Sequence, residues 1–175
     1  MKYTPKRKVF ALAFLVVLIV GLIIPQEFEN PVHQADNNSY NVNTFWYYPW
    51  GKSVTHKGVD IFAKAGTTVN SSTAGFVVFK GEIEMGGKVV LIMGPKWRLH
   101  YFAHLRNIDT ELFSWISKGE KIGTVGTTGN AKGKSPHLHY SIVTLIPYPW
   151  RIDGEKQGWK KMFYLNPITY LKSSN

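Results

Sequence analysis

The 175-residue sequence contains no cysteine, which excludes a disulfide framework, a thiolate nucleophile and any cysteine-ligated zinc or iron–sulfur site. Any bound metal must therefore be held by histidine, aspartate or glutamate. Acidic residues are also scarce: there are 11 of them against 21 lysines and arginines, and the formal net charge is +10. Hydrophobic residues make up 44% of the chain, enough for a packed core. The length permits one domain with an appendage and excludes a large multidomain protein.

The N-terminus has the pattern of an export or anchor signal. Basic residues among the first eight precede an apolar run from Val9 to Ile24. As a helix this run would extend about 24 Å, compared with a hydrocarbon core of about 30 Å. We expect residues 1–25 to form a signal-anchor or transmembrane segment that attaches the chain to the cytoplasmic membrane with the C-terminal domain outside. A cleaved signal followed by secretion is the alternative.

Beyond this segment the sequence favours a mainly β domain. Residues 26–45 are rich in Asn, Gln and Glu and are interpreted as a linker or arm, and residues 46–175 as the folded domain. Short β-rich runs alternate there with Gly, Pro, Asn and Ser, and Gly94 and Pro95 separate two such runs as a hairpin would. We predict an antiparallel β-sheet or sandwich with an open groove, preceded by one N-terminal hydrophobic helix.

A glycine-rich segment, residues 129–135, superficially matches a phosphate-binding loop. Only three residues separate Gly129 from Gly133, where that loop requires four, and the following HLHYSIV favours a strand over a helix. A nucleotide ligand is therefore not expected. The export signal likewise argues against nucleic acid as the partner of this basic chain.

The histidines carry the most specific signal. His56 and Asp60 lie four residues apart in a strand-like run, and His137 and His139 lie two apart in another, so each pair would share one strand face. Histidine and carboxylate side chains gathered in this way form a ligand set suited to zinc. Taken singly, each pair also fits an ordinary surface. His104, in YFAHL, would by itself fit a semi-buried position.

The order of these motifs adds information. THKGVDIF is followed by GGKVVLIMGP, then by HYFAHL, and then by SKGEKIGTVGTTGNAKGKSPHLHYSIV. From His56 to Val143 this order resembles the lysostaphin/LytM-like family of zinc metalloendopeptidases, which cut bacterial peptidoglycan.

The resemblance implies specific roles for five residues. His56, Asp60 and His139 would bind Zn²⁺ with water in the fourth position, and His104 and His137 would be the catalytic histidines that do not bind the metal. How these two divide the proton transfers stays open. His100 has no counterpart in the motif and is interpreted as a second-layer or surface residue.

The implied function is zinc-dependent hydrolysis of peptide cross-links in peptidoglycan during cell-wall remodelling, on the periplasmic or outer side of the membrane. Two alternatives stay open: a non-catalytic wall-binding or activator protein on the same fold, and a zinc peptidase that acts on a protein. The Asn-rich stretch 37–43 could fold over the groove and supply a fourth zinc ligand. Residues 145–165 form an insertion without an assigned role, and the bond cut and any regulatory partner stay undetermined.

Overall fold

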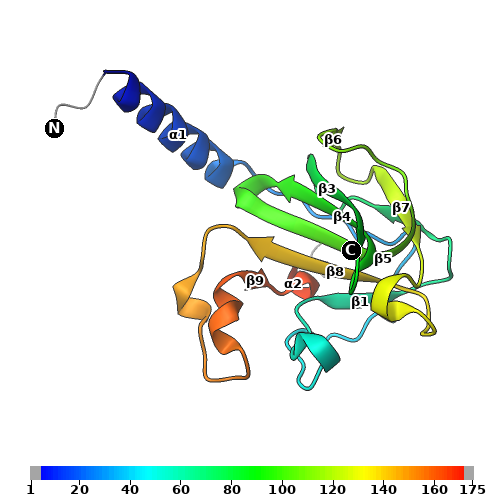
Figure 1. Cartoon of the computed structure of the whole chain (residues 1–175). Coiled ribbons are helices and arrows are strands. Elements are labelled where there is room, and N and C mark those ends of the chain that lie inside the picture. The colour runs from blue at the N-terminus through cyan, green and yellow to red at the C-terminus, as the bar shows by residue number, and fades with distance from the viewer. Residues whose placement is uncertain (1–4, 172–175) are drawn as a thin grey trace.

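The computed structural model describes residues 5–171 of the chain. Helix α1 (Pro5–Ile23) projects from a body built mainly of β-strands (Figure 1). The helix contacts this body near the turn at Pro95–Trp97, where the indole nitrogen of Trp97 donates a hydrogen bond of 2.9 Å to the carbonyl of Leu18. The predicted N-terminal hydrophobic helix is thus present.

The apolar part of α1 is short. Lys6, Arg7 and Lys8 occupy the start of the helix, and the residues after them extend about 22 Å at 1.5 Å per residue. Within the described residues, no helix has the length and apolarity that crossing a bilayer requires. The expectation of a membrane span in residues 1–25 is therefore not supported, and residues 1–4 of that segment lie outside the described part.

The body is an antiparallel sheet. Its strands are β1 (Val59–Phe62), β2 (Thr68–Asn70), β3 (Gly75–Ile83), β4 (Gly87–Gly94), β5 (Arg98–Ile108), β6 (Trp115–Ile116), β7 (Lys121–Val125), β8 (His137–Thr144) and β9 (Tyr164–Leu165). The main path runs β1-β8-β5-β4-β3-β6, with β7 bonded to β2 and β5, and β9 to β8. The mainly β, antiparallel fold class is confirmed.

Short helical turns connect several of these strands. They are η1 (Gly51–Ser53), η2 (Pro95–Trp97), η3 (Gly129–Ala131), η4 (Pro149–Arg151) and η5 (Gly158–Met162), and the described chain ends in helix α2 (Pro167–Leu171). Turn η2 joins β4 to β5, which pair antiparallel, so the hairpin predicted at Gly94 and Pro95 is confirmed.

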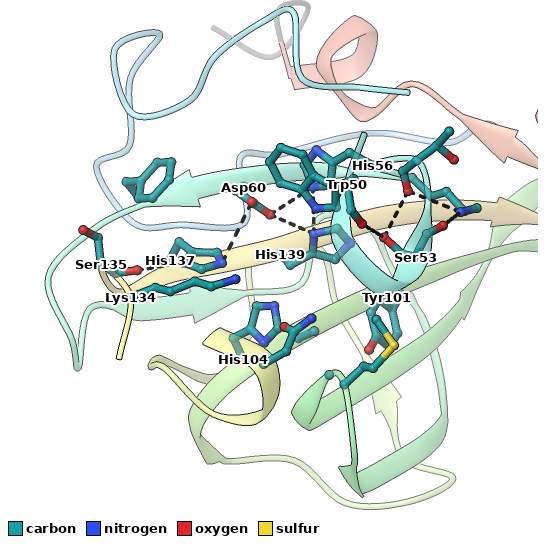
Figure 2. A pocket seen from close by; sticks show the side chains of 17 residues that line it. Trp50, Ser53, His56, Asp60, Tyr101, His104, Lys134, Ser135, His137 and His139 are labelled. Carbon is teal, nitrogen blue, oxygen red and sulfur yellow. Dashed lines mark hydrogen bonds and ion pairs between the residues drawn. The ribbon is translucent and has the colours of Figure 1, made fainter. Parts of the chain in front are cut away.

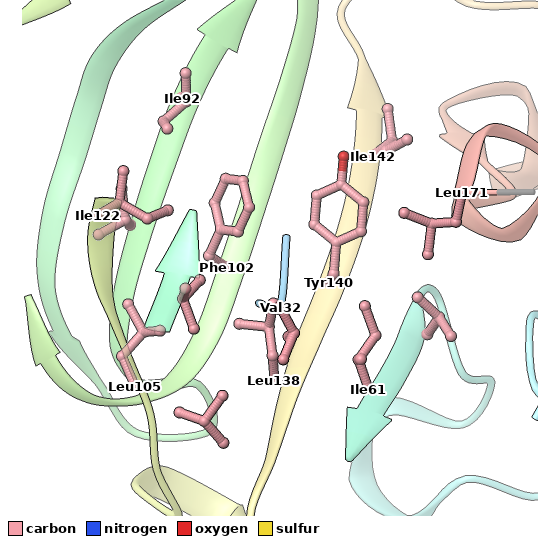
Figure 3. Packing of buried hydrophobic residues seen from close by; sticks show 14 of the residues in the cluster. Val32, Ile61, Ile92, Phe102, Leu105, Ile122, Leu138, Tyr140, Ile142 and Leu171 are labelled. Atoms are coloured by element: carbon pink, nitrogen blue, oxygen red, sulfur yellow. The ribbon is translucent and has the colours of Figure 1, made fainter. Parts of the chain in front are cut away.

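The core lies against one face of β5 and β8. Phe102 and Leu105 on β5 and Leu138, Tyr140 and Ile142 on β8 are all fully buried, and Figure 3 shows their side chains packed together. On β8 these residues alternate with His137 and His139, as the period of two along a strand requires. Burial of the apolar residues therefore directs both histidines to the opposite face.

Residues 26–45 are an integral part of the fold rather than a loosely attached arm. Val32 forms a bridge with Val69 and is 1% exposed, and Tyr40 is 5% exposed. The carbonyl of Ser39 accepts a hydrogen bond of 2.8 Å from the amide of Phe62, at the free edge of β1. The sequence did not indicate this packing, because the buried residues Pro31, Val32 and Tyr40 follow the period of neither a strand nor a helix.

The insertion 145–165 supports the segment that leads to His56. The carbonyl of Lys156 accepts a hydrogen bond from the Trp46 indole at 3.1 Å, and the Gln157 side chain accepts one from the Thr55 hydroxyl at the same distance. The segment is drawn in orange in Figure 1 and ends in β9 (Tyr164–Leu165). These hydrogen bonds thus help to hold the segment before His56, the first histidine of the motif, in place.

Replacement of Val32 by alanine tests the packing of residues 26–45. Removing two buried methyl groups should lower the free energy of unfolding by about 2 kcal/mol, through lost burial and the cavity left behind. Urea denaturation would measure the change. Val42→Ala is the matched control, because Val42 lies in the same segment but is 40% exposed. Equal, small effects of both substitutions would contradict integral packing of this segment.

Candidate metal centre and active site

The site is built on the edge pair of strands β1 and β8. In their register Asp60 stands directly opposite His139, and Phe62 stands opposite His137. Directly opposed residues on one face of an antiparallel pair have neighbouring side chains. The pairing therefore brings a carboxylate and an imidazole together without any contribution from loops.

His56 joins this pair from outside the sheet. It precedes β1, so the expectation that His56 and Asp60 share a face of one strand is wrong, although the structure does bring them together. The ring is fully buried, stacks on Trp50 with centroids 4.1 Å apart, and its Nδ1 lies 3.0 Å from the carbonyl of Thr44. Residues 44–56 thus position the ring by contacts on both of its sides.

Three potential ligand atoms converge in the site. Nε2 of His56 lies 3.1 Å from Oδ1 of Asp60 and 3.1 Å from Nδ1 of His139, and the latter two atoms are 2.8 Å apart. Figure 2 shows the three side chains pointing toward one another at the centre of the cavity. Donors that share a tetrahedral zinc ion at about 2.0–2.1 Å lie roughly 3.3 Å apart, which is close to these separations.

The protonation of these groups also fits a cation. A carbonyl can only accept, so Nδ1 of His56 donates a hydrogen bond to Thr44, and Nε2, which faces the Asp60 carboxylate, is the ring atom that a metal ion would bind. The donor set of two imidazoles and one carboxylate therefore suits a divalent metal such as zinc, with no fourth side chain among the described residues in the cluster.

Ser141 completes the orientation of His139. Its hydroxyl lies 3.0 Å from Nε2 of His139, and by accepting that proton it leaves Nδ1 free to face the metal position. Gly58 makes room for this contact, because a Cβ there would lie 2.4 Å from the Ser141 hydroxyl oxygen. Burial raises the pKa of the Asp60 carboxyl, but its contacts with His139 and His56 outweigh burial and hold that pKa well below its usual value.

His104 reaches the cavity through a bulge in β5. Lys88 of β4 pairs with Leu105 and Val90 pairs with Phe102, so β5 has one more residue than β4 across this interval. His104 has a φ of 65°, a left-handed conformation that a side-chain-bearing residue adopts at a cost of about 1–3 kcal/mol. Bulges redirect side chains in this way, and here consecutive residues Ala103 and His104 both line the cavity.

His104 and His137 stand beside the three convergent donors. Nδ1 of His104 donates to the carbonyl of Thr128 at 2.9 Å, and Nδ1 of His137 donates to that of Ser135 at 2.8 Å. The Nε2 atoms of both rings are thus not needed for these bonds; that of His137 lies 4.0 Å from Oδ2 of Asp60, and the two ring centroids are 5.0 Å apart. Burial, followed by the neighbouring rings of His139 and His137, lowers the pKa of His104 to about 4, so this imidazole is neutral at pH 7.

His100 lies elsewhere. It is fully buried on the core side of β5, with Nδ1 2.7 Å from the Tyr140 hydroxyl and Nε2 2.8 Å from the side-chain nitrogen of Gln26. Burial, and secondarily the charge of Arg98, lowers its pKa to about 3. The interpretation of His100 as a second-layer or surface residue is therefore wrong: it belongs to the core.

The cavity around these groups has a volume of about 460 Å³. All five residues singled out from the sequence line it, whereas no residue from 26 to 44 does, so the stretch 37–43 is not in place to supply a fourth ligand. Sequence reasoning missed Trp50, Lys134 and Ser141. The spacing of two from His139 is the signal that would have pointed to Ser141.

The chain belongs to peptidase family M23, whose family description matches residues 54–151. Peptidoglycan DD-endopeptidase ShyA of Vibrio cholerae is 32% identical over 114 residues, which are 65% of this chain and 26% of that protein. DD-carboxypeptidase/endopeptidase Mpg of Neisseria meningitidis serogroup B is 38% identical over 100 residues, 57% of this chain and 21% of Mpg. The relatives thus include peptidoglycan endopeptidases, and this chain spans about a quarter or less of their length.

A solved structure agrees on the fold. The catalytic domain of lysostaphin from Staphylococcus simulans superposes with a TM-score of 0.61 at 24% identity, covering 77% of this chain and 94% of that domain. This likeness concerns the arrangement of the strands.

The Ser141 contact predicts a change in metal affinity. Ser141→Ala should weaken zinc binding about tenfold, because His139 loses the partner that fixes its tautomer and ring orientation. Competition with a chromogenic chelator would measure the affinity. Ser114→Ala, in the loop before β6, serves as the control. An unchanged affinity in Ser141→Ala would show that the hydroxyl has no part in orienting the ring.

Proposed function

We propose that this protein is a zinc-dependent endopeptidase that hydrolyses peptide cross-links of bacterial peptidoglycan. The observation that carries the proposal is the convergence of His56, Asp60 and His139 beside two further histidines whose Nδ1 atoms are each bonded to a backbone carbonyl. Membership of a peptidase family with peptidoglycan endopeptidases among its relatives supports the substrate. Three ligands with an open position are typical of catalytic rather than structural zinc.

The residues that would hold zinc are His56 through Nε2, Asp60 through Oδ1 and His139 through Nδ1. Bound there, zinc supplies Lewis acidity toward the scissile carbonyl and lowers the pKa of a bound water toward about 7. Asp60 contributes the negative charge of the site, and Thr44 and Ser141 hold the two imidazoles in the orientation that ligation needs.

His104 and His137 are the proposed proton-transfer residues. Because a backbone carbonyl accepts each Nδ1 proton, each Nε2 is the basic atom available to the cavity. One ring takes the proton of the attacking water, and a protonated ring then donates to the leaving amine and hydrogen-bonds the developing oxyanion. The low pKa of His104 keeps it in the proton-accepting form at neutral pH.

The proposed site of action is outside the cytoplasmic membrane, because peptidoglycan, the proposed substrate, lies there. Residues 46–175 are proposed as the peptidase domain, with residues 26–45 as part of the same stable unit because Val32 and Tyr40 are in its core.

The zinc-loaded chain should release cross-linked peptides from purified sacculi, as detected by mass spectrometry of the muropeptides. His137→Ala and His104→Ala should each lower the rate at least about 100-fold, the usual contribution of general acid–base catalysis, while zinc stays bound. His33→Ala is the control, because His33 is exposed and does not line the cavity.

Three outcomes would change the assignment. Loss of zinc from His137→Ala would show that the division between ligands and catalytic residues is wrong. A zinc-loaded wild type that leaves sacculi unchanged but cleaves a protein would identify a protein peptidase, and a wild type that cleaves neither would identify a binding or activator protein.

A further inference from the structure

The side chains that line the cavity include two lysines but one carboxylate. Among the described lining residues, Asp60 is the only carboxylate, and it is engaged by His56 and His139. The cationic lining side chains are Lys57 and Lys134. A metal ion would add further positive charge, so an anionic group on the substrate would find attraction here and no free acid to repel it.

The ammonium group of Lys57 is bonded to backbone carbonyls of the protein itself. Its ammonium group donates to the carbonyl of Ser53 at 2.7 Å and lies 3.3 Å from that of Thr55, so it holds the loop before His56 in place. Burial, and secondarily the charge of Lys160, lowers the pKa of Lys57. This lysine therefore has little capacity to bind a second partner.

The surroundings of Lys134 differ from those of Lys57. Within residues 5–171, no ion pair or hydrogen bond involves its ammonium group. Figure 2 shows the side chain extending along the cavity below His137, with its nitrogen directed toward the space between the histidines. A flexible cation that lines a cavity without a counter-ion is suited to an incoming carboxylate.

The position of Lys134 also marks where that carboxylate would lie. Lys134 and Asn130 line both the central cavity and an adjoining one of about 280 Å³, which Trp50 and Met85 also border. Lys52 in the adjoining cavity is paired with Glu84 at 3.4 Å. The Asn130 amide could add a neutral hydrogen-bond donor beside the free ammonium group.

We propose that Lys134 binds a free carboxylate next to the scissile amide, on the residue whose amine is released. The site would therefore prefer cross-links between residues that carry a carboxylate at this position over uncharged bridges such as oligoglycine. This inference rests on the proposed endopeptidase function and specifies its substrate class. A charge-assisted hydrogen bond of Lys134, whose side chain is exposed in the free protein, should give a preference of about tenfold at most.

Two synthetic cross-linked stem peptides would test the inference, identical except that the residue contributing the scissile amine carries either a carboxylate or a carboxamide. The zinc-loaded full chain should show a kcat/KM about tenfold higher for the carboxylate. In Lys134→Met this ratio should fall to near one, whereas Lys134→Arg should keep most of it. Lys132→Met is the matched control, because Lys132 is on the same loop, is exposed and does not line either cavity.

A ratio in Lys134→Met equal to that of the wild type would overturn the inference and leave the endopeptidase proposal intact. So would a wild type that cleaves both peptides equally well. If the wild type cleaves neither, the proposed function fails, and calorimetric binding of the two peptides decides the inference separately. Binding that favours the carboxylate and loses this preference in Lys134→Met would support a carboxylate site, and equal binding of both peptides would overturn it.

Discussion

Asp60 and His139 face each other across strands β1 and β8, and the remaining features of the site depend on that pairing. The register is fixed from the other side of the sheet, where Ile61 and Leu138 are also direct partners and are fully buried. A slip of β1 by one residue would turn the apolar side chain of Ile61 to the cavity and the carboxylate of Asp60 into the core. Hydrophobic packing thus sets the geometry of the proposed ligands, and Ser141 on the same strand face refines it.

Backbone carbonyls then determine what the imidazoles can do. The carbonyls of Thr44, Thr128 and Ser135 each accept a hydrogen bond from Nδ1 of one histidine. In each ring Nε2 is then the atom that faces the cavity chemistry. His104 also needs the bulge in β5 and a left-handed backbone to reach the cavity. The surrounding structure must stabilise that conformation, which is consistent with strain retained at a site of chemistry.

Much of the site could be predicted from the sequence, because alternation along a strand encodes the face on which a side chain lies. His137 and His139 opposite the buried Leu138 and Tyr140 followed that rule. His56 did not, since a loop rather than a strand carries it. Alternation along a strand also does not reveal a bulge. The prediction that His104 belongs to the site therefore rested on the family resemblance alone. Residues 26–45 looked like a linker because their buried side chains, at positions 31, 32 and 40, produce no periodicity.

The central claim is that three acceptor atoms, and no other side chain of residues 5–171, bind one cation. Anomalous diffraction at the zinc absorption edge, from crystals grown with stoichiometric zinc, tests it most directly. The account predicts one strong peak bound by Nε2 of His56, Oδ1 of Asp60 and Nδ1 of His139, with His104 and His137 outside bonding distance. A peak ligated by His104 or His137, or no peak between His56 and His139, would contradict it.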